Sequence, residues 1–243
     1  MTKSWTLRRD DLMTREELLT LLRHLRERAE LAERRRTKTA IRNEAIVMTA
    51  VATGLRRSEI AALDIGDLRL HNENPYLVVR HGKGDKYREV PLSSRFRAFL
   101  KRYLRIKEQW GEPLAADAVV FLGERGRYSG GGVARVFKKS CVDAGLRPSL
   151  HVHAARHFLG AQLYSLTKDL MLVKKILGHS RSATTDVYVQ LEDANVRDGL
   201  TRYDALLSGA QRRAGSSSKP TRNQANRRFF DAPPMSLVSG GDA

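Results

Sequence analysis

The spacing of apolar residues along the chain predicts a mainly helical fold. Leu18, Leu22 and Leu25 recur at helical intervals after Thr14-x-x-Glu17, a capping-box pattern that starts helices, and they predict a first helix ending near residue 30. The same type of pattern predicts helices over residues 39–52, 59–63 with Ser58 as the cap, 93–109, 133–144, 153–166, 170–177, 183–190 and 194–207.

One segment departs from the helical pattern and predicts a β-hairpin. Residues 76–80 and 87–92 are typical of two strands, and Gly82-Lys83-Gly84-Asp85-Lys86 between them consists of turn-forming residues. Residues 119–122 suggest one further short extended piece. The expected fold class is therefore mainly α with a small antiparallel β-hairpin sheet.

The chain divides into three parts by composition. Residues 1–12 form a short basic leader, and residues 13–207 contain all the predicted helices and strands. From residue 208 to 243 the chain is rich in Gly, Ser, Pro, Arg and Asn, a composition typical of a disordered basic tail. Phe229 and Phe230 in this tail leave docking on a neighbouring subunit as the alternative.

The charge of the chain favours a polyanionic partner. A net charge of +17 and a pI near 10.5 point to nucleic acid first and to an anionic membrane surface second. No apolar run approaches the roughly 18 residues of a membrane span, so we expect no membrane partner.

Cys141 is the only cysteine, which excludes a disulfide within the chain and suits the reducing cytoplasm. We expect it to be a small core residue.

Six polar residues carry the strongest chemical signal, each inside its own local pattern. They are Arg56, Lys83, His153, Arg156, His179 and Tyr188. Guanidinium groups suit bidentate contact with a phosphate, and preorganised positive charge stabilises the extra negative charge of a phosphodiester at its transition state. A tyrosine can attack that phosphate if a nearby base or cation activates it, because its ordinary pKa is near 10.

The order of the local patterns resembles the tyrosine recombinases, also called phage integrases. The patterns are Thr53-Gly54-Leu55-Arg56, Gly82-Lys83-Gly84 followed by Val90-Pro91-Leu92, His153-x-x-Arg156, Leu177-Gly178-His179, and Tyr188 nine residues after His179. The resemblance covers about residues 14–207. It implies that residues 13–207 have the catalytic fold of these DNA breaking-rejoining enzymes, and that the reaction needs neither a metal nor another cofactor.

The resemblance also implies roles for the six residues. Tyr188 would attack the scissile phosphate and form a 3′-phosphotyrosyl link, while Arg56 and Arg156 hold the phosphate. Lys83, on a flexible hairpin tip, would protonate the leaving 5′-oxygen, with Lys86 as the competing candidate. His153 and His179 would accept the tyrosine proton or bind a phosphate oxygen, in an order that the sequence leaves open.

Further residues are expected to support the site or to bind DNA. Glu59 would orient the cations of the active site, and His151 is a decoy because only His153 lies three residues before Arg156. Contacts to DNA are expected from Arg34, Arg35, Arg36, Arg57, Lys86 and Arg181, although Arg57 should point away from the catalytic cluster. The implied partners are double-stranded DNA, three further copies in a homotetramer on two DNA sites, and an accessory DNA-bending protein.

Two other functions stay open on the sequence. A type IB topoisomerase-like relaxing enzyme would share the tyrosine attack but reseal the original strand, and an inactive module would only bind DNA. A P-loop and paired zinc-binding cysteines are absent from the sequence. The match begins almost at Met1, so the chain resembles short members without the usual core-binding domain, or a fragment of a longer integrase. Either form would act at the nucleoid of a prokaryote or come from a mobile element.

Overall fold

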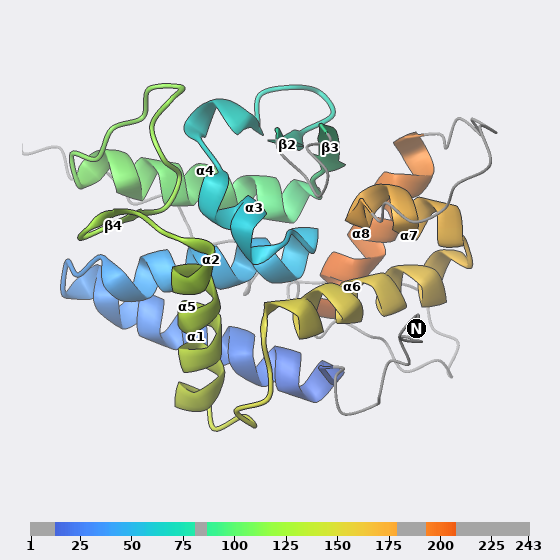
Figure 1. The fold of residues 1–243 in the computed structure, drawn as a ribbon, viewed down its shortest axis with the longest axis horizontal. Coiled ribbons are helices and arrows are strands. Elements are labelled where there is room, and N and C mark those ends of the chain that lie inside the picture. The colour runs from blue at the N-terminus through green and yellow to red at the C-terminus, as the bar shows by residue number, and fades with distance from the viewer. Residues whose placement is uncertain (1–12, 81–86, 179–192, 208–243) are drawn as a thin grey trace, which may run out of the picture.

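A computed structural model of the chain describes residues 13–80, 87–178 and 193–207, without the side chains of 193–198. In this part of the chain, helices are the main element and the strands are short (Figure 1). The helices are α1 (Arg15–Arg34), α2 (Thr39–Thr53), α3 (Arg57–Ala62), α4 (Ser94–Gln109), α5 (Gly130–Asp143), α6 (Val152–Thr167), α7 (Leu170–Leu177), α8 (Asp193–Leu207) and the 3₁₀ helix η2 (Ile65–Asp67). The strands are β1 (Leu68–Arg69), β2 (Tyr76–Val79), β3 (Arg88–Pro91), β4 (Leu122–Gly123) and β5 (Gly126–Arg127).

Helix α2 forms the centre of the core because it is apolar on nearly every side. Figure 1 shows it running through the middle of the molecule, with α1 alongside and α6, α7 and α8 gathered on one side. The phenol of Tyr203 on α8 is buried and donates a hydrogen bond to the carbonyl oxygen of Val51, 2.9 Å away. Helix α8 is thus fixed to the end of α2 that leads into the candidate site.

Helix α1 begins where the sequence predicted. The Thr14 hydroxyl accepts a hydrogen bond from the Glu17 amide (3.1 Å), and the Glu17 carboxylate accepts one from the Thr14 amide (2.8 Å), which completes the capping box. Leucines at helical spacing on one face of α1 are buried against the core. The helix continues to Arg34, one turn further than expected.

The predicted hairpin is confirmed. Strands β2 and β3 pair antiparallel with Val79 opposite Arg88, and the intervening residues 81–86 lie outside the described chain. The extended piece expected over residues 119–122 overlaps β4 at Leu122, and Val119 forms one antiparallel bridge with Asp64. The sequence did not predict β1, which adds a third strand beside β2, or β5, which pairs with β4. Each of these strands has only two residues, which is too short for an alternating pattern to show.

Two details of the prediction are wrong. Ser58 does not cap α3, because Arg56 occupies the N-cap position and the Glu59 carboxylate accepts a hydrogen bond from its amide. Helix α5 begins at Gly130 rather than near residue 133, since the Ser129 hydroxyl accepts a hydrogen bond from the Gly132 amide. The first three residues of α5 are glycines, so a prediction based on the spacing of apolar residues could not include them.

Cys141 is fully buried in α5, and this burial raises the pKa of its thiol to about 12. It is a core residue, as predicted. In the described part of the chain, none of the helices is long and apolar enough to cross a membrane.

Candidate active site

The candidate site lies where the ends of three helices meet. Gly54 ends α2 in a left-handed conformation (φ 62°), the backbone of Arg56 starts α3, and Gly178 ends α7. A Cβ atom on Gly54 would lie 2.7 Å from a methyl group of Leu177 and 3.0 Å from one of Leu159. The left-handed backbone conformation therefore favours glycine at position 54, and the two leucine methyl groups leave little room for a larger side chain.

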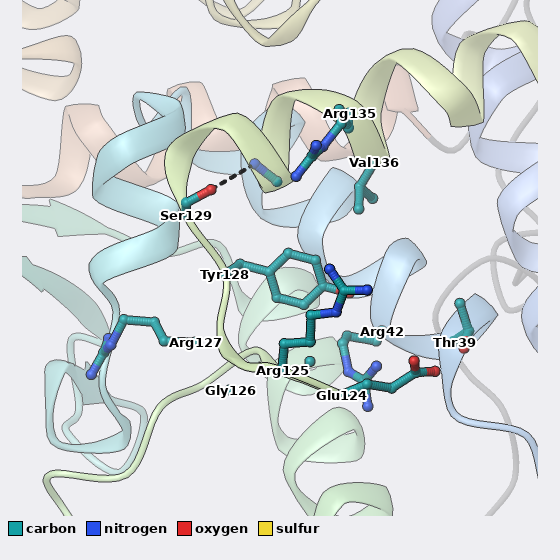
Figure 2. Close-up of a pocket in the computed structure, with 12 residues that line it drawn as sticks. Thr39, Arg42, Glu124, Arg125, Gly126, Arg127, Tyr128, Ser129, Arg135 and Val136 are labelled. Atoms are coloured by element: carbon teal, nitrogen blue, oxygen red, sulfur yellow. Dashed lines mark hydrogen bonds between the residues drawn. The ribbon is translucent and has the colours of Figure 1, made fainter.

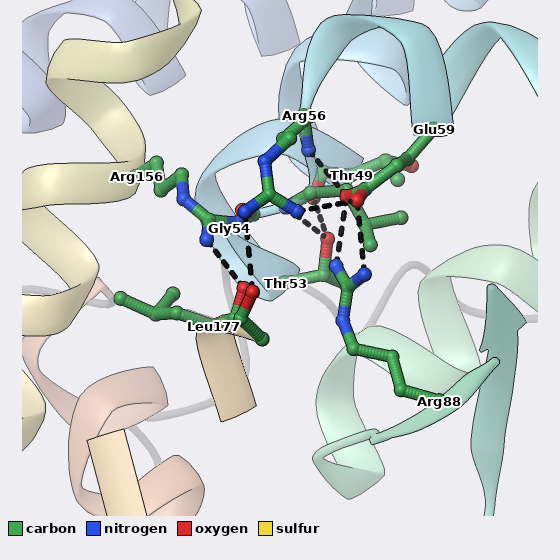
Figure 3. Close-up of polar contacts among 10 residues, drawn as sticks. Thr49, Thr53, Gly54, Arg56, Glu59, Arg88, Arg156 and Leu177 are labelled. Carbon is green, nitrogen blue, oxygen red and sulfur yellow. Dashed lines mark hydrogen bonds and ion pairs between the residues drawn. The ribbon is translucent and has the colours of Figure 1, made fainter. Parts of the chain in front are cut away.

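Arg156 joins two of these helix ends from the side of α6. Its side chain is buried and donates hydrogen bonds to the carbonyl oxygens of Gly54 (2.5 Å) and Leu177 (Figure 3). These carbonyls belong to the C-terminal turns of α2 and α7, where backbone acceptors lack helical partners. Burial, followed by the positive charge of Arg56, lowers the pKa of Arg156 to about 10, so the group is still charged at neutral pH.

Arg56 lies beside Arg156 and is held by a carboxylate and a carbonyl. Its guanidinium donates to the Glu59 carboxylate (2.7 Å) and to the carbonyl oxygen of Gly178 (3.1 Å). The amide of Arg56 donates to the other carboxylate oxygen of Glu59 (2.8 Å). Glu59 therefore fixes both the backbone and the side chain of Arg56.

Glu59 has a second arginine partner, Arg88 of β3. The Arg88 guanidinium donates to both carboxylate oxygens of Glu59, at 2.9 and 2.7 Å (Figure 3). Burial by itself would raise the pKa of Glu59, but the hydrogen bonds from Arg88 and Arg56 outweigh it and lower the pKa to about 2. Glu59 is thus a permanent anion that holds two arginines together, and its role in orienting the cations of the active site stays a prediction.

The sequence reasoning missed Arg88. A Cβ atom on Gly178 would lie 2.7 Å from the Cδ and Nε atoms of Arg88, so this side chain passes directly against the end of α7. A signal existed in the strand pattern. Arg88 lies two residues before the buried Val90 and so shares its face of β3, and a charged residue on a buried face needs a partner.

His153 lies on the first turn of α6, three residues before Arg156 and on the same side of the helix. Partial burial, followed by electrostatic interactions with His151 and Arg156, lowers the pKa of His153 below its ordinary value. His151 has a different task, because it caps α6 by accepting a hydrogen bond from the Ala154 amide at Nδ1 (3.1 Å). The choice of His153 over His151 as the catalytic histidine stays a prediction.

The other predicted residues fall into two groups. Lys83, Lys86, His179, Arg181 and Tyr188 lie outside the described residues. Arg57 is exposed, whereas its neighbour Arg56 is half-buried in the cluster. The remaining three, Arg34, Arg35 and Arg36, are exposed where α1 leads into α2, about 20 Å from Gly54 at the other end of that helix.

The cluster has an excess of positive charge. Arg56, Arg88 and Arg156 are compensated by the single carboxylate of Glu59, which leaves a formal charge of about +2 in a half-buried position. Such a site favours an anion with several acceptor oxygens, and a phosphodiester fits this description. Within the described chain, no group of three or more His, Cys, Asp or Glu side chains could hold a metal ion.

The low pKa of Glu59 predicts a pH-dependent loss of stability. Glu59→Gln should lower the free energy of unfolding by about 3 kcal/mol at pH 7. Because the pKa falls from 4.5 in the unfolded chain to about 2 in the folded one, the difference between wild type and variant should be complete above pH 4.5. It should shrink as the pH falls toward 2, since the wild-type carboxylate then becomes protonated.

Urea unfolding at pH 7, 4.5 and 3 measures this difference. Glu89→Gln, at an exposed position of β3, is the matched control. A constant difference over this range would contradict the prediction.

Comparison with known proteins places this geometry in a family. The model of the phage integrase family matches residues 11–195. Tyrosine recombinase XerC of Actinobacillus pleuropneumoniae is 34% identical over 174 residues, which are 71% of this chain and 54% of that protein. The chain therefore spans about half the length of the curated relatives it matches.

Solved structures show the same fold. XerH site-specific recombinase, in a pre-cleavage complex with its difH substrate, superposes with a TM-score of 0.56 at 28% identity, covering 70% of this chain and 47% of that one. The integrase from mycobacterium phage Brujita has a TM-score of 0.58 at 20% identity, covering 87% and 66%. The expected fold class, mainly helical with small antiparallel sheets in the manner of tyrosine recombinases, is confirmed.

Proposed function

Since this chain belongs to the phage integrase family, the tyrosine recombinases, we propose that it breaks and rejoins DNA at specific sites. The observation that carries the proposal is the meeting of Arg56 and Arg156, one hundred residues apart in sequence, around the ends of α2 and α7. The carboxylate of Glu59 does not balance the positive charges of this cluster, and a DNA phosphate would supply the missing negative charge. The XerH relative was solved with its DNA substrate, which supports DNA as the partner here.

Arg56 and Arg156 act as preorganised phosphate ligands. A guanidinium has five N–H donors, and the protein contacts of each arginine use only part of them. The remaining donors can bind the non-bridging oxygens, where negative charge grows as the phosphate is attacked. Because both arginines are fixed by carbonyl and carboxylate acceptors, little reorganisation is needed during the reaction.

The cleavage step uses Tyr188 as nucleophile. Its phenolic oxygen forms a bond to phosphorus while the bond to the 5′-oxygen breaks, leaving a 3′-phosphotyrosyl link. Lys83, or Lys86 in its place, donates a proton to the departing 5′-oxygen. His153 or His179 takes the proton of the phenol or binds a phosphate oxygen, and the lowered pKa of His153 keeps it able to accept a proton at neutral pH.

Rejoining reverses the chemistry with another strand. A 5′-hydroxyl attacks the phosphotyrosyl link, the P–O bond to Tyr188 breaks, and the phosphodiester is restored without ATP, since the bond energy is retained. Four copies on two DNA sites exchange strands in this way, with an accessory protein that bends the DNA. The reaction takes place at the nucleoid in the cytoplasm.

A nicked suicide substrate tests the proposal. DNA flanking the native gene is nicked close to the cleavage point, so that the short released strand diffuses away and the covalent complex accumulates. A covalent adduct on gel electrophoresis supports the recombinase. A protein that only binds DNA would trap nothing, and relaxation of any supercoiled plasmid without site preference would favour a type IB topoisomerase-like enzyme.

The lowered pKa of His153 predicts the pH profile of cleavage. If neutral His153 accepts the proton of Tyr188, the cleavage rate at subsaturating DNA should stay high at pH 7 and fall only below pH 6.5. Single-turnover cleavage between pH 5 and 8 measures this limb. His153→Asn should be slow throughout and lack the limb. A wild-type decline with a midpoint above pH 6.5 would contradict this role.

A further inference from the structure

A second positively charged hollow lies outside the candidate active site (Figure 2). It is a pocket of about 490 Å³ between the N-terminus of α2, the β4–β5 pair and the first turns of α5. Four arginines line it and Glu124 is the only acidic residue among the described residues of its wall. The four are Arg42, Arg125, Arg127 and Arg135.

The four arginines differ in their partners. Arg127 is neutralised, because it donates to the Asp64 carboxylate at 2.6 Å, and Figure 2 shows it pointing away from the hollow. Arg125 and Arg135 are exposed and form no hydrogen bond or ion pair with any residue that the structure describes. Their guanidinium groups are therefore free to bind an incoming anion.

Arg42 adds positive charge that the protein does not balance. It is 5% exposed, and its Nε has no hydrogen-bond acceptor among the described residues. Its ion-pair partner Glu112 (3.4 Å) is shared with the buried Lys107 (2.9 Å) and with Lys38 (3.5 Å). Three cations thus share one carboxylate behind the pocket wall, and buried charge without a counter-ion is costly unless an anion approaches.

The start of α5 supplies backbone donors on the same side. Ser129 caps the helix through the Gly132 amide, and both residues line the pocket. The first amides of a helix lack intrahelical acceptors and carry the positive end of its dipole, so they bind anions well. Of the three glycines that start α5, only Gly132 lines the pocket, and a side chain there would press against Tyr128.

We propose that this pocket binds a phosphate group other than the scissile one. Forked guanidinium groups and helix amides match the oxygens of a phosphate. The phosphate comes either from the DNA backbone or from a free phosphate ion. Gly130 packs against the backbone of Ser58, next to Arg57 and Arg56, so the pocket and the candidate active site flank the same contact between α3 and α5. One duplex could therefore reach both, and this DNA source rests on the proposed function.

The test removes the two free guanidinium groups together. Arg125→Ala/Arg135→Ala should weaken duplex DNA binding about tenfold at 0.1 M salt, and should reduce the slope of log Kd against log salt by about 1. The matched control is Arg28→Ala/Arg105→Ala, which removes two exposed arginines of α1 and α4 and leaves the slope unchanged.

Glu124→Gln should act in the opposite direction and tighten DNA binding, with Glu27→Gln as its control. Fluorescence anisotropy measures the DNA, and thermal unfolding in potassium phosphate against potassium chloride at equal ionic strength measures the free ion.

The outcomes distinguish the DNA backbone from a free phosphate ion as the ligand, and they distinguish failure of the pocket from failure of the proposed function. A loss of DNA affinity specific to the pocket variant assigns the DNA backbone, whereas a loss of phosphate stabilisation with unchanged DNA binding assigns the free ion. Equal effects in pocket and control variants, or no effect in either assay, overturn the pocket. If the wild-type protein binds no DNA, the proposed function fails, and the thermal assay with free phosphate still decides whether the pocket is an anion site.

Discussion

Replacing Tyr188 with phenylalanine is expected to abolish the covalent protein–DNA adduct and to leave DNA affinity within about twofold. The change removes one oxygen atom, the only atom of this side chain that can attack phosphorus. Loss of the nucleophile should reduce cleavage by at least about 10⁴-fold, the scale seen when an essential catalytic group is removed. The aromatic ring remains, so binding through arginine and lysine to the DNA backbone should persist.

The measurement is the suicide-substrate trap, with binding followed in parallel by anisotropy. Tyr87→Phe is the matched control, because Tyr87 is an exposed tyrosine at the base of the hairpin whose phenol donates a hydrogen bond to the Glu89 carboxylate. It should form adduct at the wild-type rate. Adduct in the Tyr188→Phe protein, or a peptide map that places the DNA on another tyrosine, would overturn the assignment of the nucleophile.

The helices could be predicted because their pattern is local. Leu18, Leu22 and Leu25 define one face of α1, and the glycines at 54 and 178 stop helices where the left-handed conformation is needed. The strands β1 and β5 could not be predicted, because two residues are too few to show an alternating pattern. The start of α3 was placed wrongly for another reason: the side chain that caps it is Glu59, which lies within the helix and not before it.

The site was predicted to the extent that its motifs are contiguous in sequence. Arg56, Glu59 and Arg156 do meet, and His151 is separated from His153 by its own capping bond. Arg88 shares the buried face of β3 with Val90, which indicates that it needs a partner, but its contacts with Glu59 and Gly178 arise only in the folded structure. The roles of Lys83, His179 and Tyr188 stay predictions, as do the boundaries of the catalytic domain.

Glu59 and Arg88 explain how separate segments are brought to one place. Arg88 follows the 81–86 segment that carries Lys83, and it lies against Gly178, which precedes His179. Its two hydrogen bonds to Glu59 connect β3 and the end of α7 to the carboxylate that also fixes Arg56. One buried anion thereby sets the positions of the hairpin base and of the end of α7 relative to Arg56.

The second large effect is expected for Arg156→Lys, which keeps the charge and removes the fork. A lysine has one nitrogen at the end of a flexible chain, so it cannot serve the carbonyls of Gly54 and Leu177 and a phosphate together. Cleavage should fall about 10²- to 10³-fold, the usual cost of losing a preorganised donor to a developing anion. Stability should fall by about 1–3 kcal/mol, because a buried carbonyl is left unpaired.

Separating these two losses decides what Arg156 does. The cleavage rate is measured at a temperature well below the midpoint of thermal unfolding, and it is divided by the folded fraction that circular dichroism gives. Arg105→Lys, on the exposed side of α4, is the control. If the guanidinium binds the scissile phosphate, cleavage per folded molecule must drop even where the variant is fully folded. If it drops only with stability, Arg156 is a structural link between the ends of α2 and α7, and of the two arginines proposed to hold the phosphate only Arg56 would keep that role.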